Sequence, residues 1–445
     1  MSTPSSPPAN DAHSKALALN LESSVYGTFA EIGAGQEVAR WFLSVGAASG
    51  TVAQAISAYD KTVSDDIYGA GTRYVSKERL LAMLDREYQI LLDRLDKDRG
   101  AHTRFFVFAD TIATRNYQGT NEQHGWLGIR FQAEPKGQPN EILLHVHLGD
   151  STAQLQQEAV GTLGVNLIYA AYHQRSSPET FLPGLLEELS FERGEIDVLE
   201  LKGPAFAGVD SRLWCLHMLR NGLSHAFVFD SKAQAVEPAT PLRKRPIIVH
   251  STLHGDASVS AAVPFQAAQE QFLAEGKTFE REPAVILALT KQNFEDPVVD
   301  NAALLARIEQ LAPLGAVVVT DYTEGYELTN YLRRYTTAPI RVILWISDLL
   351  QIMEETVYQE LPGTVLERLG RLLLSDVTIY VAPMRREQFI ATYGNLPEGV
   401  LHPHAGSDLI TLEDFLPKSP TEHLFRYLRA ADRIIPLKAT QTAAG

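Results

Sequence analysis

Hydrophobic positions in the second half of the chain form short, nearly continuous runs separated by amphipathic segments. The runs are "PIIVHS", "PAVILAL", "GAVVVTD", "IRVILWI" and "VTIYVAP". Helices are expected between them, around 261–276, 301–312, 326–336 and 348–374. Unbroken Val/Ile/Leu strands alternating with helices are typical of a parallel sheet covered on both faces. The pattern predicts a Rossmann-like parallel α/β domain over 246–415, with a short helix and a frayed tail over 416–445.

In the first half of the chain, the spacing of the hydrophobic positions changes twice. Residues 16–100 are predicted to be mainly helical, and the clearest helix begins after a Ser76 cap and ends at Gly100. Strands are predicted at 103–110, 125–134 and 141–150, followed by a helix from 151 to 173. A strand–helix–strand unit then closes the domain near residue 235. The predicted fold class is therefore α/β: a helical N-terminal region leading into an α/β domain, followed by the second, parallel one.

Composition sets the expected boundaries between these parts. Residues 1–18 are rich in Ser, Pro and Ala, which predicts a disordered tail. The segment 231–245 is polar, contains proline and is basic within an acidic chain, which is typical of a linker. The predicted domains are therefore 19–235 and 246–415.

The stretch "TFAEIGAGQEVARWF" at 28–42 contains the glycine spacing of a turn that holds a cofactor. Such a turn must follow a buried strand, because the strand aims the helix N-terminus at the ligand. The preceding "LNLESSVYGTFA" has no continuous apolar run. The sequence therefore predicts a joint between two helices that holds no dinucleotide.

Charge and cysteine content exclude several classes of function. The net charge of −15 and the pI near 5.4 disfavour nucleic acid and anionic membranes as partners. No apolar run reaches the ~18 residues of a membrane span, and the N-terminus has no apolar signal core. The single cysteine, Cys215, lies in an apolar helical stretch and is predicted to be a core residue. A soluble protein of the reducing cytoplasm is expected.

Three predicted strands end in aspartate, at Asp110, Asp230 and Asp321. Ligands of open α/β sheets gather at the carboxyl ends of strands, so these acids are candidates for general-base, ribose or metal contacts. Asp321 ranks first, because Glu324 and Arg333 follow it closely. Arg333, or its neighbour in "YLRRY", could clamp a phosphate or carboxylate. The alternative is that the acids cap turns and the arginines lie on a solvated helix face.

The stretch "RNYQGTNEQHGW" (115–126) is the densest polar segment of the chain. Arg115, Asn116 and Gln123 offer donors and acceptors between two strands, as a binding loop would. His124 is a candidate general acid or base near neutral pH. Turn chemistry alone is the competing interpretation.

His145 and His147 are two residues apart on one predicted strand, so their side chains point to the same face. This spacing occurs in metal sites, and Asp150 or His124 could complete one. Hydrogen-bonded histidines on a half-buried strand are the alternative. No Gly-Lys-Ser/Thr phosphate loop and no Gly-x-Ser-x-Gly elbow is present, which excludes those classes of hydrolase.

Several segments together resemble an uncharacterised family of bacterial proteins: "VYGTFAEIGAGQEVARWF", "ISAYDKTVSDDIYG", "RYVSKERLLAMLDREYQILLDRL" and "HGWLGIRFQ". The likeness is extended over residues 20–175 and looser through "RIEQLAPLGAVVVTDYTEGYELTNYLRRYTTAPI". This sequence is shorter at its C-terminus than is usual for the family. Members carry two labels, nicotinate or nicotinamide mononucleotide adenylyltransferase and TonB-dependent receptor.

Neither label agrees with the motifs of this chain. The receptor label implies a secreted barrel of many alternating strands, which the parallel α/β pattern contradicts. The adenylyltransferase label implies a Gly-x-Phe-x-Pro-x-His-x-Gly-His loop after the first strand. The corresponding "HSTLHGDASVSAAVPF" has His250, His254 and Gly255 but lacks Phe-x-Pro and the Gly-His pair.

Two functions remain open from the sequence. The first is binding of a small anionic or nucleotide-like metabolite, with a nucleotidyl- or other transferase as the reaction class. The second is a non-catalytic scaffold on the same folds. For the first, the crevice is placed between the strands ending at Ser251 and Asp321, with His254 and Asp256 beside it. The cofactor is unknown, and the sequence leaves open whether the chain forms a homo-oligomer.

Overall fold

The computed structural model describes residues 11–71, 73–252, 262–295, 299–354, 363–404 and 406–438. The chain separates into two compact units, residues 1–225 and 226–445, each with its own sheet. The fold is α/β, as the sequence predicts. Within the described residues, no helix is long and apolar enough to cross a membrane.

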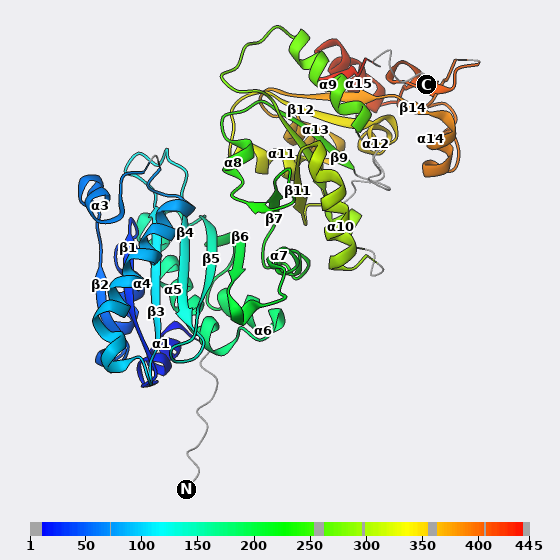
Figure 1. The fold of residues 1–445 in the computed structure, drawn as a ribbon. Coiled ribbons are helices and arrows are strands. Elements are labelled where there is room, and N and C mark those ends of the chain that lie inside the picture. The colour runs from blue at the N-terminus through cyan, green and yellow to red at the C-terminus, as the bar shows by residue number, and fades with distance from the viewer. Residues whose placement is uncertain are drawn as a thin grey trace. The chain divides into compact units, whose positions relative to one another are not determined.

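The N-terminal unit contains a six-stranded sheet in the order β2-β1-β3-β4-β5-β6 (Figure 1). Strands β1, β2 and β3 are parallel, and β3 to β6 continue as an antiparallel meander. The strands are β1 (Val25–Ile32), β2 (Val52–Ile56), β3 (Arg104–Ala113), β4 (His124–Gln132), β5 (Pro139–Leu148) and β6 (Gly194–Lys202). The helices are α1 (Ala12–Asn20), α2 (Glu37–Ser44), α3 (Lys61–Tyr68), α4 (Lys77–Arg99), α5 (Ala153–His173), α6 (Pro178–Leu185) and α7 (Ser211–Arg220).

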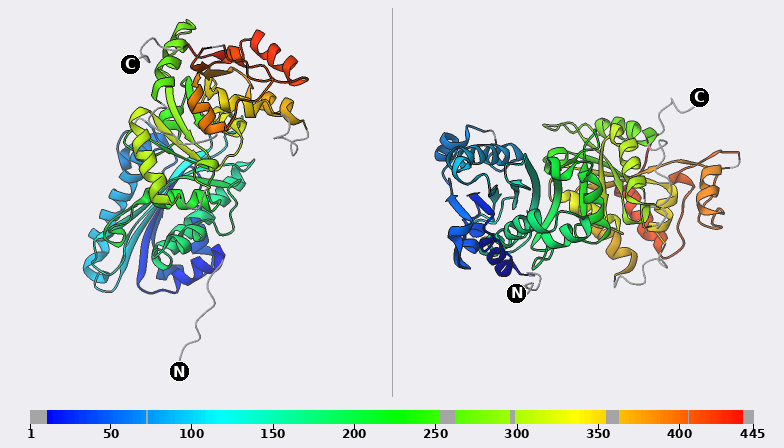
Figure 2. Two further views of the ribbon diagram at one scale, coloured as in Figure 1. Left: turned by 90° about the vertical axis from the view of Figure 1, so that its right-hand side faces the viewer. Right: turned by 60° about the horizontal axis from the view of Figure 1, so that its bottom comes forward.

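Helices cover both faces of this sheet (Figures 1 and 2). On one face, the apolar stripe of α4 packs against β1, β3 and β4, with Leu80, Leu84 and Tyr88 among its buried residues. The helix begins at the predicted cap, where the Ser76 side chain accepts from the Arg79 N–H. On the other face, α2 packs on β1 through Phe42 and Phe29, whose ring centroids are 4.9 Å apart.

Strands β1 and β2 correct the prediction that residues 16–100 are mainly helical. Gly27 interrupts the apolar run of β1 because the chain there passes directly over Phe106. A Cβ on Gly27 would lie 2.4 Å from the carbonyl oxygen and ring of that residue. The glycine therefore permits close strand packing, and it does not mark a turn.

Helix α1 corrects the expectation that residues up to 18 form a disordered tail. It begins at an Asp11 cap, whose side chain accepts from the Ser14 N–H. Lys15 is fully buried and donates to Asn166 and to the Gly184 carbonyl. These contacts attach the helix to the rest of the unit.

The C-terminal unit contains an eight-stranded sheet in the order β16-β13-β12-β9-β10-β11-β7-β8. The strands are β7 (Ala226–Phe229), β8 (Ala235–Val236), β9 (Ile247–Thr252), β10 (Ala284–Leu289), β11 (Ala316–Thr320), β12 (Ile340–Trp345), β13 (Val377–Ala382) and β16 (Ile434–Pro436). A small separate pair consists of β14 (Met384–Arg385) and β15 (Leu409–Ile410). The helices are α8 (Ala239–Leu242), α9 (Ala262–Ala274), α10 (Asn301–Leu311), α11 (Gly325–Arg333), α12 (Ile346–Ile352), α13 (Thr364–Leu372), α14 (Arg386–Tyr393) and α15 (Thr421–Ala430).

The five apolar runs of the sequence are the parallel strands β9 to β13, as predicted. The predicted assignment of 226–230 to the first domain is wrong, because β7 pairs antiparallel with β11 of the second sheet. The segment expected to be a linker is also part of this unit: β8 pairs with β7, and Leu242 is buried. At the other end, β16 extends the sheet beside β13 within the segment predicted to hold only a helix and a frayed tail.

Candidate functional site

The topology of the first sheet gathers polar side chains at one edge. Strands β1, β3 and β5 end at this edge, whereas β4 and β6 begin there. The connections after β1, β2 and β3 also leave from it. Because β1 lies between β2 and β3, the chain reverses its direction of progress across the sheet at β1. Such a reversal is where open α/β sheets place their ligands.

The glycine turn lies at this reversal, and its predicted local structure is wrong. Strand β1 runs directly to Gly33, and α2 begins at Glu37, so the turn joins a strand to a helix. Gly33 has φ +98°, and a Cβ there would lie 1.9 Å from the Ile112 carbonyl oxygen. Only glycine fits a backbone that turns with positive φ this close to β3.

The N-terminus of α2 is occupied by one of the chain's own carboxyl groups. The Glu31 oxygens accept from the Val38 and Ala39 N–H groups, each at 2.9 Å. In a dinucleotide-binding turn, N–H groups of this kind bind a phosphate. The Glu31 carboxyl group occupies the position that such a phosphate would take.

Asp110 lies opposite Glu31 on the neighbouring parallel strand and is fully buried. Its Oδ1 accepts from the Ile32 N–H at 3.0 Å, whereas Oδ2 makes no hydrogen bond. Burial raises the pKa of Glu31 to about 7. Burial, together with the nearby Glu31, raises the pKa of Asp110 well above its ordinary value. The two carboxyl groups therefore retain a proton in the neutral range and hold the turn in place.

The predicted polar loop lies at the same edge, between β3 and β4. Its backbone is held internally: the Asn121 side chain accepts from the Asn116 N–H, and Gln123 donates to the Asn121 carbonyl. The Gln156 side chain accepts from the Arg115 N–H at 2.7 Å. The Arg115 guanidinium itself is exposed and forms no ion pair within the described residues. Arg115 is therefore available to a ligand, whereas Asn116 and Gln123 shape the loop.

Two exposed tyrosines at this edge were not recognised from the sequence. Tyr59 follows β2 and is 82% exposed, and Tyr117 in the polar loop is fully exposed. The only sign of them in the sequence was an aromatic residue in a polar connection at the end of a strand. Rings in such positions can stack on a planar ligand.

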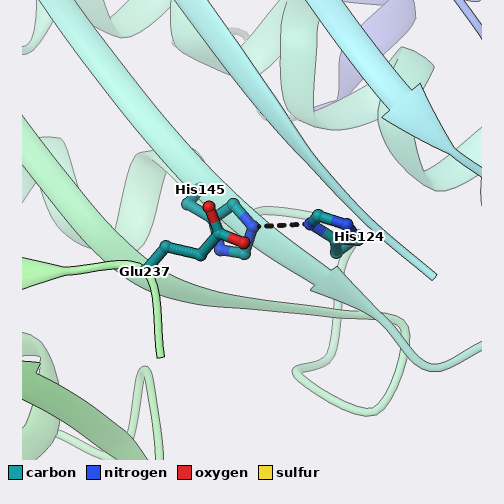
Figure 3. A group of neighbouring side chains, drawn as sticks. All are labelled: His124, His145 and Glu237. Carbon is teal, nitrogen blue, oxygen red and sulfur yellow. Dashed lines mark hydrogen bonds between the residues drawn. The ribbon is translucent and has the colours of Figure 1, made fainter. Parts of the chain in front are cut away.

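A hydrogen-bonded series of three buried side chains begins at the same edge. His124 Nδ1 lies 2.9 Å from His145 Nε2, and His145 Nδ1 lies 2.5 Å from Asp197 Oδ1. Figure 3 shows the two imidazole rings facing each other across their hydrogen bond. They come from the antiparallel strands β4 and β5, and Asp197 comes from β6. The Trp126 ring packs against His145 at 5.1 Å between centroids.

The chemistry of Asp197 fixes the proton positions along this series. An ionised carboxylate only accepts, so His145 donates from Nδ1 and its Nε2 carries a lone pair. His124 then donates from Nδ1 to His145, which leaves the lone pair of His124 on Nε2. A proton accepted at that nitrogen would be stabilised through both rings by the Asp197 charge. Asp197 itself was missed in the sequence, although an acid within the apolar run of "EIDVLELKG" was a usable signal.

The predicted metal pair is only partly brought together. His145 is joined to His124, which was one of the two residues named to complete the site. Among the described residues, no group of three or more potential ligand residues with atoms within 4.8 Å of one another includes His147 or Asp150. Asp150 instead pairs with Arg193 at 2.9 Å.

The candidates in the second unit do not converge. The predicted crevice borders, the strands ending at Ser251 and Asp321, are not neighbours, because β10 lies between β9 and β11. The reversal of strand order falls between β9 and β12. His254 and Asp256 lie outside the described residues.

The charged residues predicted beside Asp321 have structural partners. Glu324 begins α11 and pairs with Arg368 at 2.8 Å. Arg333, at the opposite end of α11, donates to the Ala338 carbonyl. Asp230 accepts from the Lys232 and Gln234 N–H groups in the turn between β7 and β8. The spacing in the sequence therefore did not bring Asp321 and Arg333 to one site.

Comparisons with known proteins give a limited likeness. No protein-family model and no curated protein matches the chain. A competence/damage inducible protein, CihA, from Agrobacterium tumefaciens is 18% identical with a TM-score of 0.28, over 38% of this chain and 98% of that one. A competence-damaged protein (CinA) superfamily structure from Enterobacter cloacae is 14% identical with a TM-score of 0.28, over the same shares of the two chains. One from Escherichia coli is 16% identical with a TM-score of 0.26, over 37% of this chain and 91% of that one. Likenesses of this size carry no inference about activity, and none of these structures bears either family label.

Proposed function

We propose that the N-terminal unit binds a small, nucleotide-like anionic metabolite at the carboxyl edge of its sheet and transfers a proton to or from it through His124. The observation that carries this proposal is the series Asp197–His145–His124, in which each member fixes the proton position of the next. Burying three titratable groups is costly unless they are paired, and such series are typical of general acid–base catalysis.

The rest of the edge supplies the contacts that such a ligand needs. Arg115 is exposed without an ion pair in the described residues and can bind a phosphate or carboxylate through two donors. Tyr59 and Tyr117 follow the strands on either side of β1 and offer rings for stacking. The anion is expected at Arg115, because Glu31 already occupies the N-terminus of α2.

Thermal-shift screening of the whole chain against nucleotides and related metabolites tests the binding part. A nucleotide-like compound should raise the melting temperature of the wild-type chain. In the Arg115→Gln variant, the same rise should require at least a tenfold higher ligand concentration. Gln118→Ala, an exposed change in the same loop, is the matched control and should bind like the wild type. Equal binding by Arg115→Gln, or the absence of any hit, would refute the binding proposal.

The catalytic part is tested on the compound found in this way. His124→Asn should abolish turnover and leave the thermal shift in place, because the proposed role of the ring is proton transfer. Asp197→Asn should lower turnover by ~10²- to 10⁴-fold, the usual contribution of general acid–base catalysis. Unchanged turnover in both variants would refute proton transfer through His124 and would support only the binding part of the proposal.

The same pair of histidines supports a second candidate function, binding of a transition metal. Metal-ligating histidines usually donate their second ring N–H to a carboxylate, as His145 does to Asp197. His145 Nε2 and His124 Nδ1 would then be the ligand atoms. Elemental analysis of untagged protein decides between the candidates: a stoichiometric metal lost in His145→Gln supports this one, and metal-free active protein supports proton transfer.

A further inference from the structure

The second sheet has its own reversal of strand order, distinct from the edge described above. From β9 the chain proceeds to β10 and β11 on one side, then returns to β12 and β13 on the other. Helix α9 covers one face, where Phe272 packs on Arg341 of β12. Helix α13, which follows β12, covers the other face through Val365 and Leu369. The carboxyl ends of β9 and β12 therefore meet where connections leave toward opposite faces, which is where such sheets bind ligands.

His250 lies near the end of β9 at this reversal, and one of its ring nitrogens lacks a hydrogen-bond partner. It is 1% exposed, and its Nε2 makes no hydrogen bond. Buried polar atoms are almost always paired, because an unpaired one loses the hydrogen bonds it made with water. Burial also lowers the pKa of the ring to about 4, so the imidazole is neutral at pH 7.

Two aromatic rings border this imidazole. Phe265 of α9 lies 5.8 Å away between centroids, and Trp345 at the end of β12 lies 6.0 Å away, both edge-on. Trp345 is only partly buried. The surroundings thus combine one unpaired polar atom with aromatic walls.

We propose that the C-terminal unit carries a separate binding site at the ends of β9 and β12 for a neutral, planar nitrogen heterocycle. The heterocycle forms a hydrogen bond with His250 Nε2 and packs its ring against Trp345. A neutral group is favoured because His250 brings no charge to the site. A planar one is favoured because the flanking side chains are aromatic.

The test uses the full chain and a fixed set of neutral heterocycles at millimolar concentration: purine, pyrimidine, nicotinamide and indole. In ¹H–¹⁵N spectra of histidine-labelled protein, at least one compound should shift the His250 ring nitrogens. His250→Phe keeps an aromatic ring and removes the unpaired nitrogen. It should abolish that binding and raise the melting temperature of the C-terminal unit by a few degrees in the absence of ligand.

His423→Phe, a change at an exposed histidine on α15, is the matched control and should bind like the wild type. Three results would each overturn the proposal. They are no shift of the His250 signals with any compound, equal binding by His250→Phe, and a lower melting temperature of that variant without ligand. The last would mean that Nε2 is satisfied within the protein.

Discussion

Replacing Glu31 by Gln should reverse its effect on stability between acidic and alkaline pH. In the native state the buried carboxyl keeps its proton up to a pKa of about 7, against an ordinary value of 4.5. The folded state therefore binds more protons than the unfolded state between these values, and its stability falls as the pH rises through this window. A difference of 2.5 in pKa corresponds to a loss of about 3 kcal/mol from the free energy of unfolding, which begins near pH 4.5 and is complete above pH 7.

Glutamine removes the ionisation at the cost of one hydrogen bond. Its single carbonyl oxygen can accept from Val38 or Ala39 but not from both, which costs about 1 kcal/mol. Glu31→Gln should therefore be about 1 kcal/mol less stable than the wild type at pH 4 and about 2 kcal/mol more stable at pH 8. For a unit of this size, the melting temperature should fall by about 2–4 °C at pH 4 and rise by about 4–8 °C at pH 8.

Differential scanning calorimetry of both proteins across pH 4–8 measures the effect, since all other titrating groups are common to the two. Glu200→Gln is the matched control. Lys77 and Lys202 donate to the Glu200 carboxylate and lower its pKa, so this change should reduce stability throughout the range. A Glu31→Gln variant that is less stable by the same amount at both pH values would refute the burial argument.

Three further predictions concern the turn, the cysteine and the segment between the sheets. Gly33→Ala should destabilise the N-terminal unit by more than about 2 kcal/mol in urea unfolding, because the Cβ meets the Ile112 carbonyl at a positive φ; a neutral effect would contradict the turn geometry. Cys215 should react with a thiol reagent only after denaturation, because burial raises its pKa to about 12; fast labelling of the native protein would contradict this. Limited proteolysis should spare 235–242, because β8 is paired and Leu242 is buried; a first cut there would restore the linker interpretation.

The sequence predicted the parts of the fold in which hydrophobic period and structure agree. The Val/Ile/Leu runs of the second unit became β9 to β13, and the Ser76 cap began α4 as expected. It failed at β1, where Gly27 breaks the apolar run because Phe106 occupies the space that a larger side chain would need. That failure also concealed the strand before the glycine turn.

The candidate site was predicted only in part, with His124 as one of two residues that could complete a site at His145. His124 and His145 were both named, yet their contact depends on the antiparallel pairing of β4 with β5, which no local pattern specifies. Asp197 joins them from β6, about fifty residues further along the chain. Asp321 and Arg333 were expected together from their spacing, but the length of α11 separates them. The spacing of residues along the sequence therefore could not predict a site that is formed by side chains from several strands.

Long-range ¹H–¹⁵N spectra of the histidine rings at pH 8 test the central claim most directly, because they report which nitrogen carries the proton. Proton transfer through the series predicts that both His124 and His145 carry it on Nδ1. Asp197→Asn should release His145 to the commoner Nε2–H form. A metal bound between the rings would instead leave the proton of His124 on Nε2. Wild-type spectra with Nε2–H on both histidines, unchanged in Asp197→Asn, would contradict the proposed series.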